Sequence, residues 1–215
     1  AVISVPDVPI IYQVALNLQK QHLDDLICKH MKLNCKSEAD MSDWVSLINK
    51  IQNLKKHVRI GLVGKYVDLH DAYISVYESL KYAGYAYDLK VDVDWVNSED
   101  LTEDNIKTVL KDAQGIIVPG GFGNRGIEGK MLAIKYAREN NVPYLGLCLG
   151  MQLALIEYAR GILKIEDANS SEFDENAKNK IIDYLPDQYK GIKMGGTMRL
   201  GEYDCHIKEG TKAYS

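Results

Sequence analysis

The stretch VPYLGLCLGMQLALIEYAR, residues 142–160, joins two elements of opposite kind around a single cysteine. Residues 142–148 are an apolar run typical of a buried strand, and residues 149–160 have apolar side chains at helical spacing. Cys148 lies at the junction. The pattern leaves two interpretations open: Cys148 is a buried thiol of the core, or it is a nucleophile held out on a sharp turn from strand to helix.

The same alternation of strand and helix extends upstream of this junction. Short apolar runs typical of strands alternate with amphipathic runs typical of helices, and the connections between them are short. The strand-like runs are 58–66, 90–96 and 115–121, and the helical runs are 71–86, 98–113 and 126–140. This alternation predicts a three-layer α/β/α sandwich with a mainly parallel central sheet.

The first part of the chain has a different pattern. Residues 11–33 and 41–56 are apolar at helical spacing, a polar segment separates them, and no strand pattern occurs. We expect helices and a linker over residues 1–56, and one α/β domain over residues 57–215. The pattern weakens after Glu172, where residues 195–210 resemble strands around a turn.

The composition argues against several classes of function. The chain has 46% apolar and 26% charged residues and a formal net charge of −4, so we expect no nucleic-acid surface. No apolar run approaches the roughly 18 residues that a membrane helix needs, and no signal-peptide pattern is visible. The four cysteines lack zinc-site spacing. We therefore expect a cytoplasmic protein with no metal site, in which Cys28, Cys35 and Cys205 are partly buried thiols.

The motif GFGNRG, residues 121–126, has the spacing of a dinucleotide-binding loop. It follows the third strand of the predicted sheet, whereas that fingerprint belongs to the first turn from strand to helix. The roughly 20-residue offset to a ribose-binding acid reaches Gly146, and the strand there ends without an acid. We therefore do not assign a dinucleotide to this loop.

The segment 146–150 has the form G-x-C-x-G, which is the cysteine version of a nucleophile elbow. A nucleophile on so tight a turn leaves no room for side chains at Gly146 and Gly150. The helix that begins at Leu149 directs its N-terminus at the sulfur, and its partial positive charge favours the reactive thiolate. The backbone N–H of Leu149 is a candidate for one half of an oxyanion hole.

The other half is expected from a neighbouring strand end. Gly120 and Gly121 follow the strand-like run 115–118, and glycines allow the backbone to expose an N–H group close to a ligand. The motif 121–126 thus fits an oxyanion loop opposite the elbow. The other interpretation is that 118–126 is only a flexible turn and Cys148 only a buried thiol.

These segments resemble class-I glutamine amidotransferases, in which an elbow cysteine attacks the side-chain amide of glutamine. The resemblance covers nearly the whole chain and is sharpest for the CTP synthase family. It implies a flavodoxin-like domain preceded by the tail of a synthetase domain. The segments that carry it are VPGGFGNRGIEG (118–129), ARENNVPYLGLCLGMQLALIEYAR (137–160), NSSEF (169–173), MGGTMRLG (194–201), GLVGKYVDLHDAYISVYESL (61–80) and LDDLICKHMKLNC (23–35).

The resemblance also implies roles for particular residues. Cys148 matches the family's nucleophile, and Glu172 matches a carboxylate that holds the α-ammonium group of glutamine. Arg125 and Glu128 fall in a loop that the family places near the site, and we assign them no role. The remaining positions that match oxyanion or glutamine contacts are Gly120, Gly121, Leu149, Gly150, Met151 and Gln152.

One part of the family's pattern is missing from this sequence. The family's catalytic histidine and glutamate stand in an H-P-E motif near its C-terminus, and none of the five histidines here precedes Pro-Glu. We expect a glutaminase domain that is incomplete at its C-terminus. These 215 residues should bind glutamine weakly and hydrolyse it negligibly, because no group would protonate the departing ammonia.

The resemblance also implies partners that belong to a longer protein. The family aminates UTP with ammonia from glutamine, consumes ATP with Mg²⁺ in its synthetase domain, responds to GTP and forms homotetramers. No cofactor is expected in this chain itself. Two other functions stay open: a non-catalytic binding or assembly module of the same fold, and a different hydrolase with an elbow cysteine.

Overall fold

The computed structural model describes residues 2–34, 39–184, 204–212 and 214. The chain divides into two compact units, Ala1–Glu157 and Tyr158–Ser215. Over the described residues, no helix has both the length and the apolar character that crossing a bilayer requires. The first unit holds the sheet that was predicted from the sequence.

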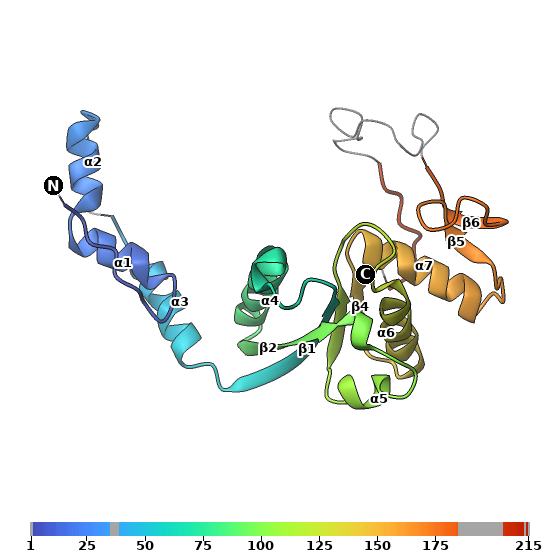
Figure 1. The fold of residues 1–215 in the computed structure, drawn as a ribbon. Helices are drawn as coiled ribbons and strands as arrows, with labels where there is room; N and C mark the ends of the chain where they lie inside the picture. The colour runs from blue at the N-terminus through green and yellow to red at the C-terminus, as the bar shows by residue number, and fades with distance from the viewer. Residues whose placement is uncertain (1, 35–38, 185–203, 213, 215) are drawn as a thin grey trace. The chain divides into compact units, whose positions relative to one another are not determined.

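That sheet is built from β1 (Lys56–Gly64), β2 (Leu89–Asn97), β3 (Gly115–Val118) and β4 (Tyr144–Gly146). Its strand order is β2-β1-β3-β4, and all three pairings are parallel (Figure 1). This order agrees with the flavodoxin-like arrangement, in which ligands bind at the carboxyl ends of the strands. The parallel sheet expected from the sequence is therefore confirmed.

Helices cover both faces of the sheet. Helix α4 (Ile74–Ala86) connects β1 to β2 and contacts β2, whereas α6 (Ile127–Glu139) connects β3 to β4 and contacts both strands (Figure 1). The two connections run in opposite directions along the sheet. Because such crossovers are right-handed, they place α4 and α6 on opposite faces. The three-layer α/β/α architecture is confirmed.

The central strands are buried on both faces, which explains their continuous apolar sequences. All four residues of β3 are buried, and Leu62 and Val63 of β1 are fully inaccessible to solvent. Leu62 and Ile117 form a core cluster with Tyr73, against which α4 packs. Burial of this kind contributes about 1.5–3 kcal/mol for each large aliphatic side chain.

The helix predicted over residues 98–113 is wrong in extent. The segment forms a 3-10 turn, η2 (Ser98–Asp100), and a single short helix, α5 (Ile106–Val109). The backbone N–H of Thr102 donates to the side-chain oxygen of Asn105 at 2.9 Å, and the Asn105 N–H donates to the Thr102 hydroxyl at 3.3 Å. These side chains satisfy backbone groups locally and so compete with a longer helix.

The N-terminal region is helical, as expected. It consists of α1 (Gln13–Lys20), α2 (Leu23–His30) and α3 (Ser42–Gln52). The apolar run 11–33 divides into two helices at His22, whose φ of 56° lies in the left-handed region. The Trp44 indole donates to the Tyr12 carbonyl at 2.6 Å and ties α3 to the start of α1. The proposed boundary near residue 56 falls between α3 and β1 and stays a prediction.

The cysteines differ from the simple expectation of buried thiols. Cys28 of α2 is disulfide-bonded, so its prediction as a free thiol is wrong. Cys148 and Cys205 are free, and both are exposed. Cys35 lies outside the described residues. Exposure of the Cys148 thiol removes the interpretation of this residue as part of the buried core.

The second unit contains a small sheet that sequence patterns did not reveal. Helix α7 (Leu149–Gly161) crosses the boundary between the units, and β5 (Ala168–Ser170) pairs in parallel with β6 (Asn179–Ile182). Both strands are short and mostly polar, so they lack the alternation that predicts strands. The hairpin predicted at 195–210 lies mainly outside the described residues, and residues 204–210 contain no strand.

The contact between α6 and η2 yields a prediction about stability. A Cβ atom added to Gly129 would lie 1.7 Å from the Ser98 carbonyl oxygen, so the two backbones leave no space for a methyl group. We expect Gly129→Ala to lower the free energy of unfolding by about 2–3 kcal/mol, as overpacking does elsewhere. Urea unfolding followed by circular dichroism measures this change.

A matched control lies on the same helix. Lys135 of α6 is exposed, and its ion pair with Glu103 spans 3.2 Å at the surface. Lys135→Ala should change the free energy of unfolding by less than about 0.5 kcal/mol, because surface ion pairs contribute little. Equal stabilities of Gly129→Ala and the wild type would show that α6 and η2 are not packed this closely.

Candidate active site

Cys148 occupies the link between β4 and α7 in a strained backbone conformation. Its φ of 51° lies in the left-handed region, which a residue with a Cβ atom rarely adopts. The side chain is exposed, and α7 begins at the next residue. Strain of this kind costs on the order of 1–3 kcal/mol and is concentrated at functional sites. The conformation is that of a nucleophile elbow.

The glycines on either side of Cys148 stand where the turn leaves no space. A Cβ atom on Gly146 would lie 2.4 Å from the carbonyl carbon of Gly150. A Cβ atom on Gly150 would lie 2.1 Å from the carbonyl oxygen of Val118 in β3. The steric role predicted for both glycines is therefore confirmed, and the start of α7 rests directly on the end of β3.

The Gly120–Gly121 loop lies beside the elbow. A Cβ atom on Gly120 would lie 3.3 Å from the Cβ of Cys148 and 3.9 Å from its sulfur. The Leu147 N–H donates to the Val118 carbonyl at 2.9 Å and holds the two strand ends together. Leu149 is buried, and its Cδ2 would be 3.8 Å from a Cβ on Gly121. The structure therefore brings the predicted oxyanion residues together around Cys148.

The other predicted glutamine contacts are distributed over both units. Met151 and Gln152 follow the elbow in the first turn of α7, where Met151 is exposed and Gln152 half-buried. Glu172 belongs to the second unit, just after β5, and its N–H donates to the Ser170 hydroxyl at 3.2 Å. The glutamine contacts assigned to these residues stay predictions.

Three basic residues surround the Gly120–Gly121 loop, and sequence reasoning assigned a role to none of them. The Lys65 ammonium, at the end of β1, donates to the carbonyl oxygen of Phe122. The Arg125 guanidinium donates to the Lys65 carbonyl at 3.3 Å and forms an ion pair with Glu99 at 3.0 Å. Lys130, in α6, is the third. Only the position of Lys65 near the end of the predicted strand-like run 58–66 could have marked it in the sequence.

Lys130 is the unusual member of this group because its ammonium is buried. Its side chain is fully inaccessible to solvent, and its Nζ has no hydrogen-bond acceptor among the described residues. Burial, as the largest cause, and the charges of Lys65 and Arg125 together lower the pKa of Lys130 to about 8. A Cβ atom on Gly121 would lie 3.9 Å from this ammonium.

Two histidines of the first unit, His57 and His70, contact other side chains. His57 stands near the amino-terminal end of β1, where it contacts Asp92 at 2.7 Å, whereas Cys148 follows the carboxyl end of β4. The ring of His70 stacks on Trp95 with 4.1 Å between the ring centroids. His57 lies at the wrong end of the sheet for a base acting on Cys148.

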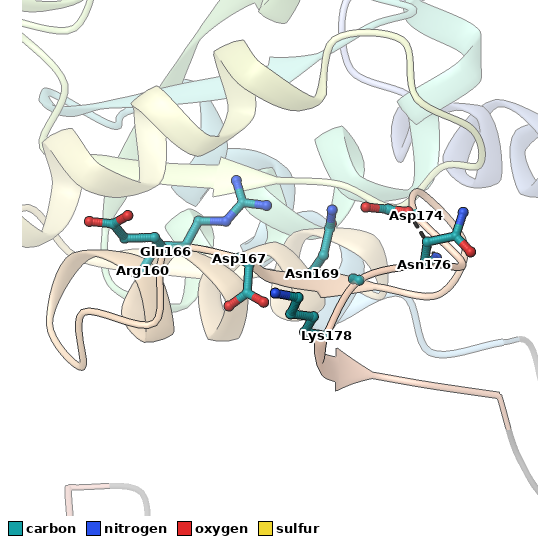
Figure 2. A pocket seen from close by; sticks show the side chains of 8 residues that line it. Arg160, Glu166, Asp167, Asn169, Asp174, Asn176 and Lys178 are labelled. Carbon is teal, nitrogen blue, oxygen red and sulfur yellow. Dashed lines mark hydrogen bonds between the residues drawn. The ribbon is translucent and has the colours of Figure 1, made fainter.

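The second unit has a polar depression of its own (Figure 2). Some of its lining side chains are paired with neighbouring groups, since Asn179 donates to Asp167 at 2.6 Å and the Arg160 Nε donates to the Ala168 carbonyl at 2.7 Å. Cys148 is not among the lining residues. In the described part of the chain, histidine, cysteine and acidic side chains form no group of three that could hold a metal ion.

Comparison of the sequence with known proteins shows which family the chain resembles. The family model "Glutamine amidotransferase class-I" matches residues 68–215. The chain is 55% identical over all 215 residues to a CTP synthase from Geobacillus kaustophilus and 57% identical over 214 residues to one from Bacillus subtilis. It spans 40% of the length of each of these relatives.

A solved structure has a similar fold over part of this chain. The glutaminase domain of the Trypanosoma brucei CTPS with bound acivicin superposes with a TM-score of 0.58 at 40% identity, over 62% of this chain and 52% of that one. The chain belongs to the class-I glutamine amidotransferases. Its predicted resemblance to the CTP synthase family is confirmed by these relatives.

The elbow geometry predicts that Gly150→Ala disables Cys148. The added methyl group would push the start of α7 away from the Val118 carbonyl and displace the sulfur. A shift of about 1 Å at a reacting atom can lower a rate about a hundredfold. We expect a loss of that order in the rate at which an electrophilic glutamine analogue labels Cys148. Leu155→Ala, on an exposed site of α7, should leave the rate unchanged.

Buried Lys130 predicts an unusual dependence of stability on pH. Its pKa is about 8 in the folded chain, below the ordinary 10.5, so between these values the unfolded chain binds a proton that the folded chain does not. Wild-type stability should therefore gain from this group as the pH rises through that window. Lys130→Met removes the buried charge, and it should add roughly 3 kcal/mol to the free energy of unfolding at pH 7.

The difference in the free energy of unfolding between Lys130→Met and the wild type should fall to zero above about pH 10.5, where the lysine is neutral in both the folded and the unfolded chain. Urea unfolding of the wild type and Lys130→Met across this range measures it, with exposed Lys135→Met as the control. Destabilisation by Lys130→Met at pH 7 would contradict the prediction, since it would mean that the ammonium makes a favourable bond.

Proposed function

We propose that this chain is the glutamine-hydrolysing part of a CTP synthase and that Cys148 is its nucleophile. The observation that carries the proposal is the strained, exposed conformation of Cys148 beside Gly120, at the carboxyl end of a parallel sheet. A thiol in the core would need neither the positive φ nor the glycines on each side. The amidotransferase family and its CTP synthase relatives give the substrate class.

The proposed reaction begins at the side-chain amide of glutamine. The Cys148 thiolate attacks the amide carbon, and the carbonyl oxygen becomes an oxyanion that the N–H groups of Leu149 and the Gly120–Gly121 loop stabilise. The C–N bond then breaks, and the nitrogen takes up a proton and leaves as ammonia. Water hydrolyses the remaining γ-glutamyl thioester to glutamate and restores the thiol.

The proton for the departing ammonia needs a donor that these elements do not supply. In the family this role belongs to a histidine in an H-P-E motif, which the present 215 residues lack. We assign it to a part of the longer protein outside this chain, whose CTP synthase relatives extend well beyond the matched region. Residues 1–215 alone should therefore react once with an electrophile but turn over glutamine negligibly.

The ammonia has a proposed destination in that longer protein. A synthetase domain, of which residues 1–56 are the proposed tail, would use it with ATP and Mg²⁺ to aminate UTP. Regulation by GTP, assembly into a homotetramer and a cytoplasmic location are part of the same proposal. They rest on the similarity to CTP synthases over the whole chain.

Covalent labelling tests the role of Cys148 directly. A chloroketone analogue of glutamine should alkylate Cys148 of the 215-residue chain, because the thiolate displaces chloride and forms a C–S bond. Glutamine added at millimolar concentration should protect Cys148, and mass spectrometry of peptides identifies the labelled residue. Exposed Cys205 is a control within the same molecule, and it should react slowly and without protection.

Two variants complete the test. Cys148→Ser should abolish the protected label and leave the reaction of Cys205 unchanged. Cys205→Ser should leave the protected label intact. Equal labelling of Cys148 and Cys205 with no protection by glutamine would support a non-catalytic module and reject the proposed function.

A further inference from the structure

The buried ammonium of Lys130 has no role in the proposed function so far. Its Nζ lies in a protein interior where an unpaired charge is unfavourable by several kcal/mol, and no acceptor among the described residues compensates for it. A methionine would fill the same space without the charge. The position of this charge, directly behind the oxyanion loop, suggests what it does.

The Gly120–Gly121 segment separates the Lys130 ammonium from the Cys148 sulfur. Gly120 faces Cys148, since a Cβ there would be 3.9 Å from the sulfur. Gly121 faces the two lysines, since a Cβ there would be 3.4 Å from Cε of Lys65 and 3.9 Å from Nζ of Lys130. One side of this peptide segment therefore contacts the nucleophile, and the other contacts buried positive charge.

Of these three cations, Lys130 is the one whose charged group has no hydrogen-bond acceptor in the part of the chain that the structure describes. The Lys65 ammonium donates to the Phe122 carbonyl, and the Arg125 guanidinium is paired with Glu99 of η2. Both cations lie close enough to Lys130 to lower its pKa. The Lys130 side chain is fully inaccessible to solvent, and Leu149 of α7, which is apolar and buried, lies near the same Gly121 position. The field of the Lys130 ammonium is therefore poorly screened by solvent.

We propose that Lys130 is a positioning residue whose buried positive charge polarises and holds the Gly120–Gly121 loop, so that the loop stabilises the oxyanion formed on attack by Cys148. This inference rests on the proposed function of Cys148. The ammonium never contacts glutamine, and it acts through the peptide groups in front of it. Preorganised charge near a developing oxyanion lowers the barrier without reorganisation during the reaction.

The expected effect is smaller than the loss of a direct oxyanion donor. Removing such a donor lowers rates by about a hundredfold to a thousandfold, and a charge one layer behind it should contribute about tenfold. Lys130→Met keeps the length and shape of the side chain and removes only the charge. We expect this variant to be more stable than the wild type at pH 7 and yet about tenfold slower in forming an oxyanion.

Two electrophiles separate this role from a general effect on the thiol. The Cys148 thiolate first adds to the ketone of the chloroketone analogue and forms an oxyanion; the C=O bond then re-forms as the sulfur moves to the neighbouring carbon and chloride leaves, which gives the alkylated cysteine. Iodoacetamide alkylates the same sulfur by displacement of iodide and forms no oxyanion. Lys130→Met should slow the chloroketone reaction at saturation about tenfold, leave its half-saturating concentration unchanged and leave the iodoacetamide rate unchanged.

The ratio of the wild-type rate to the Lys130→Met rate in the chloroketone reaction should also depend on pH. The charge of Lys130 is present below its pKa of about 8 and lost above it, so the ratio should be about ten near pH 7 and approach one by about pH 10. Mass spectrometry of the Cys148 peptide gives both rates over this range. Lys135→Met, on an exposed part of the same helix, should give a ratio of one throughout.

The possible results lead to different conclusions. Glutamine-protected labelling of the wild type with equal rates in Lys130→Met would overturn the role of Lys130 and leave the proposed function standing. A ratio that does not change with pH, or an equal loss with iodoacetamide, would also overturn it, because packing or thiol reactivity would then be the cause. Absence of protected labelling in the wild type would reject the proposed function, and the role of Lys130 with it.

Discussion

The contact between Gly150 and the carbonyl of Val118 is the constraint on which the site depends. It joins the first turn of α7 to the last residue of β3 with no side chain between them, so the chain must reverse within the four residues from Gly146 to Leu149. The reversal forces Cys148 to a positive φ and exposes its sulfur. The nucleophile is therefore held by the packing of a helix on a sheet.

The same packing brings a source of instability into the core. Closing α6 onto β3 and α7 buries Lys130 behind the Gly120–Gly121 loop without an acceptor among the described residues. The strained cysteine and the buried ammonium are both unfavourable for folding, and both lie at one edge of one sheet. Much of the chain's stability must then come from elsewhere, chiefly from the doubly covered strands β1 and β3.

The division of the chain into two units has a consequence for the site. The nucleophile and the oxyanion loop belong to the unit that contains the parallel sheet, whereas Glu172 belongs to the other unit. Cys148 and Glu172, to which the proposed reaction assigns bond cleavage and recognition of the α-ammonium group, thus belong to different units. A covalent reaction at Cys148 reports on the first, and protection by glutamine requires recognition of the substrate as well.

The sequence by itself determined the parallel α/β architecture and the place of the elbow, because both depend on local signals. Alternating apolar runs identify strands and helices one at a time, and the glycines around Cys148 mark a turn that allows no side chains. Their order along the chain was enough to place Gly120 and Gly121 beside Cys148, since the carboxyl ends of parallel strands share one edge.

Only the tertiary structure decided the break of the helix expected at 98–113 and the burial of Lys130. In the sequence, Lys130 and Lys135 are two similar lysines of one amphipathic helix. One is buried without a partner and the other is exposed beside Glu103, because burial depends on which elements close over a residue. That information comes from contacts between segments far apart in the chain, and no local pattern contains it.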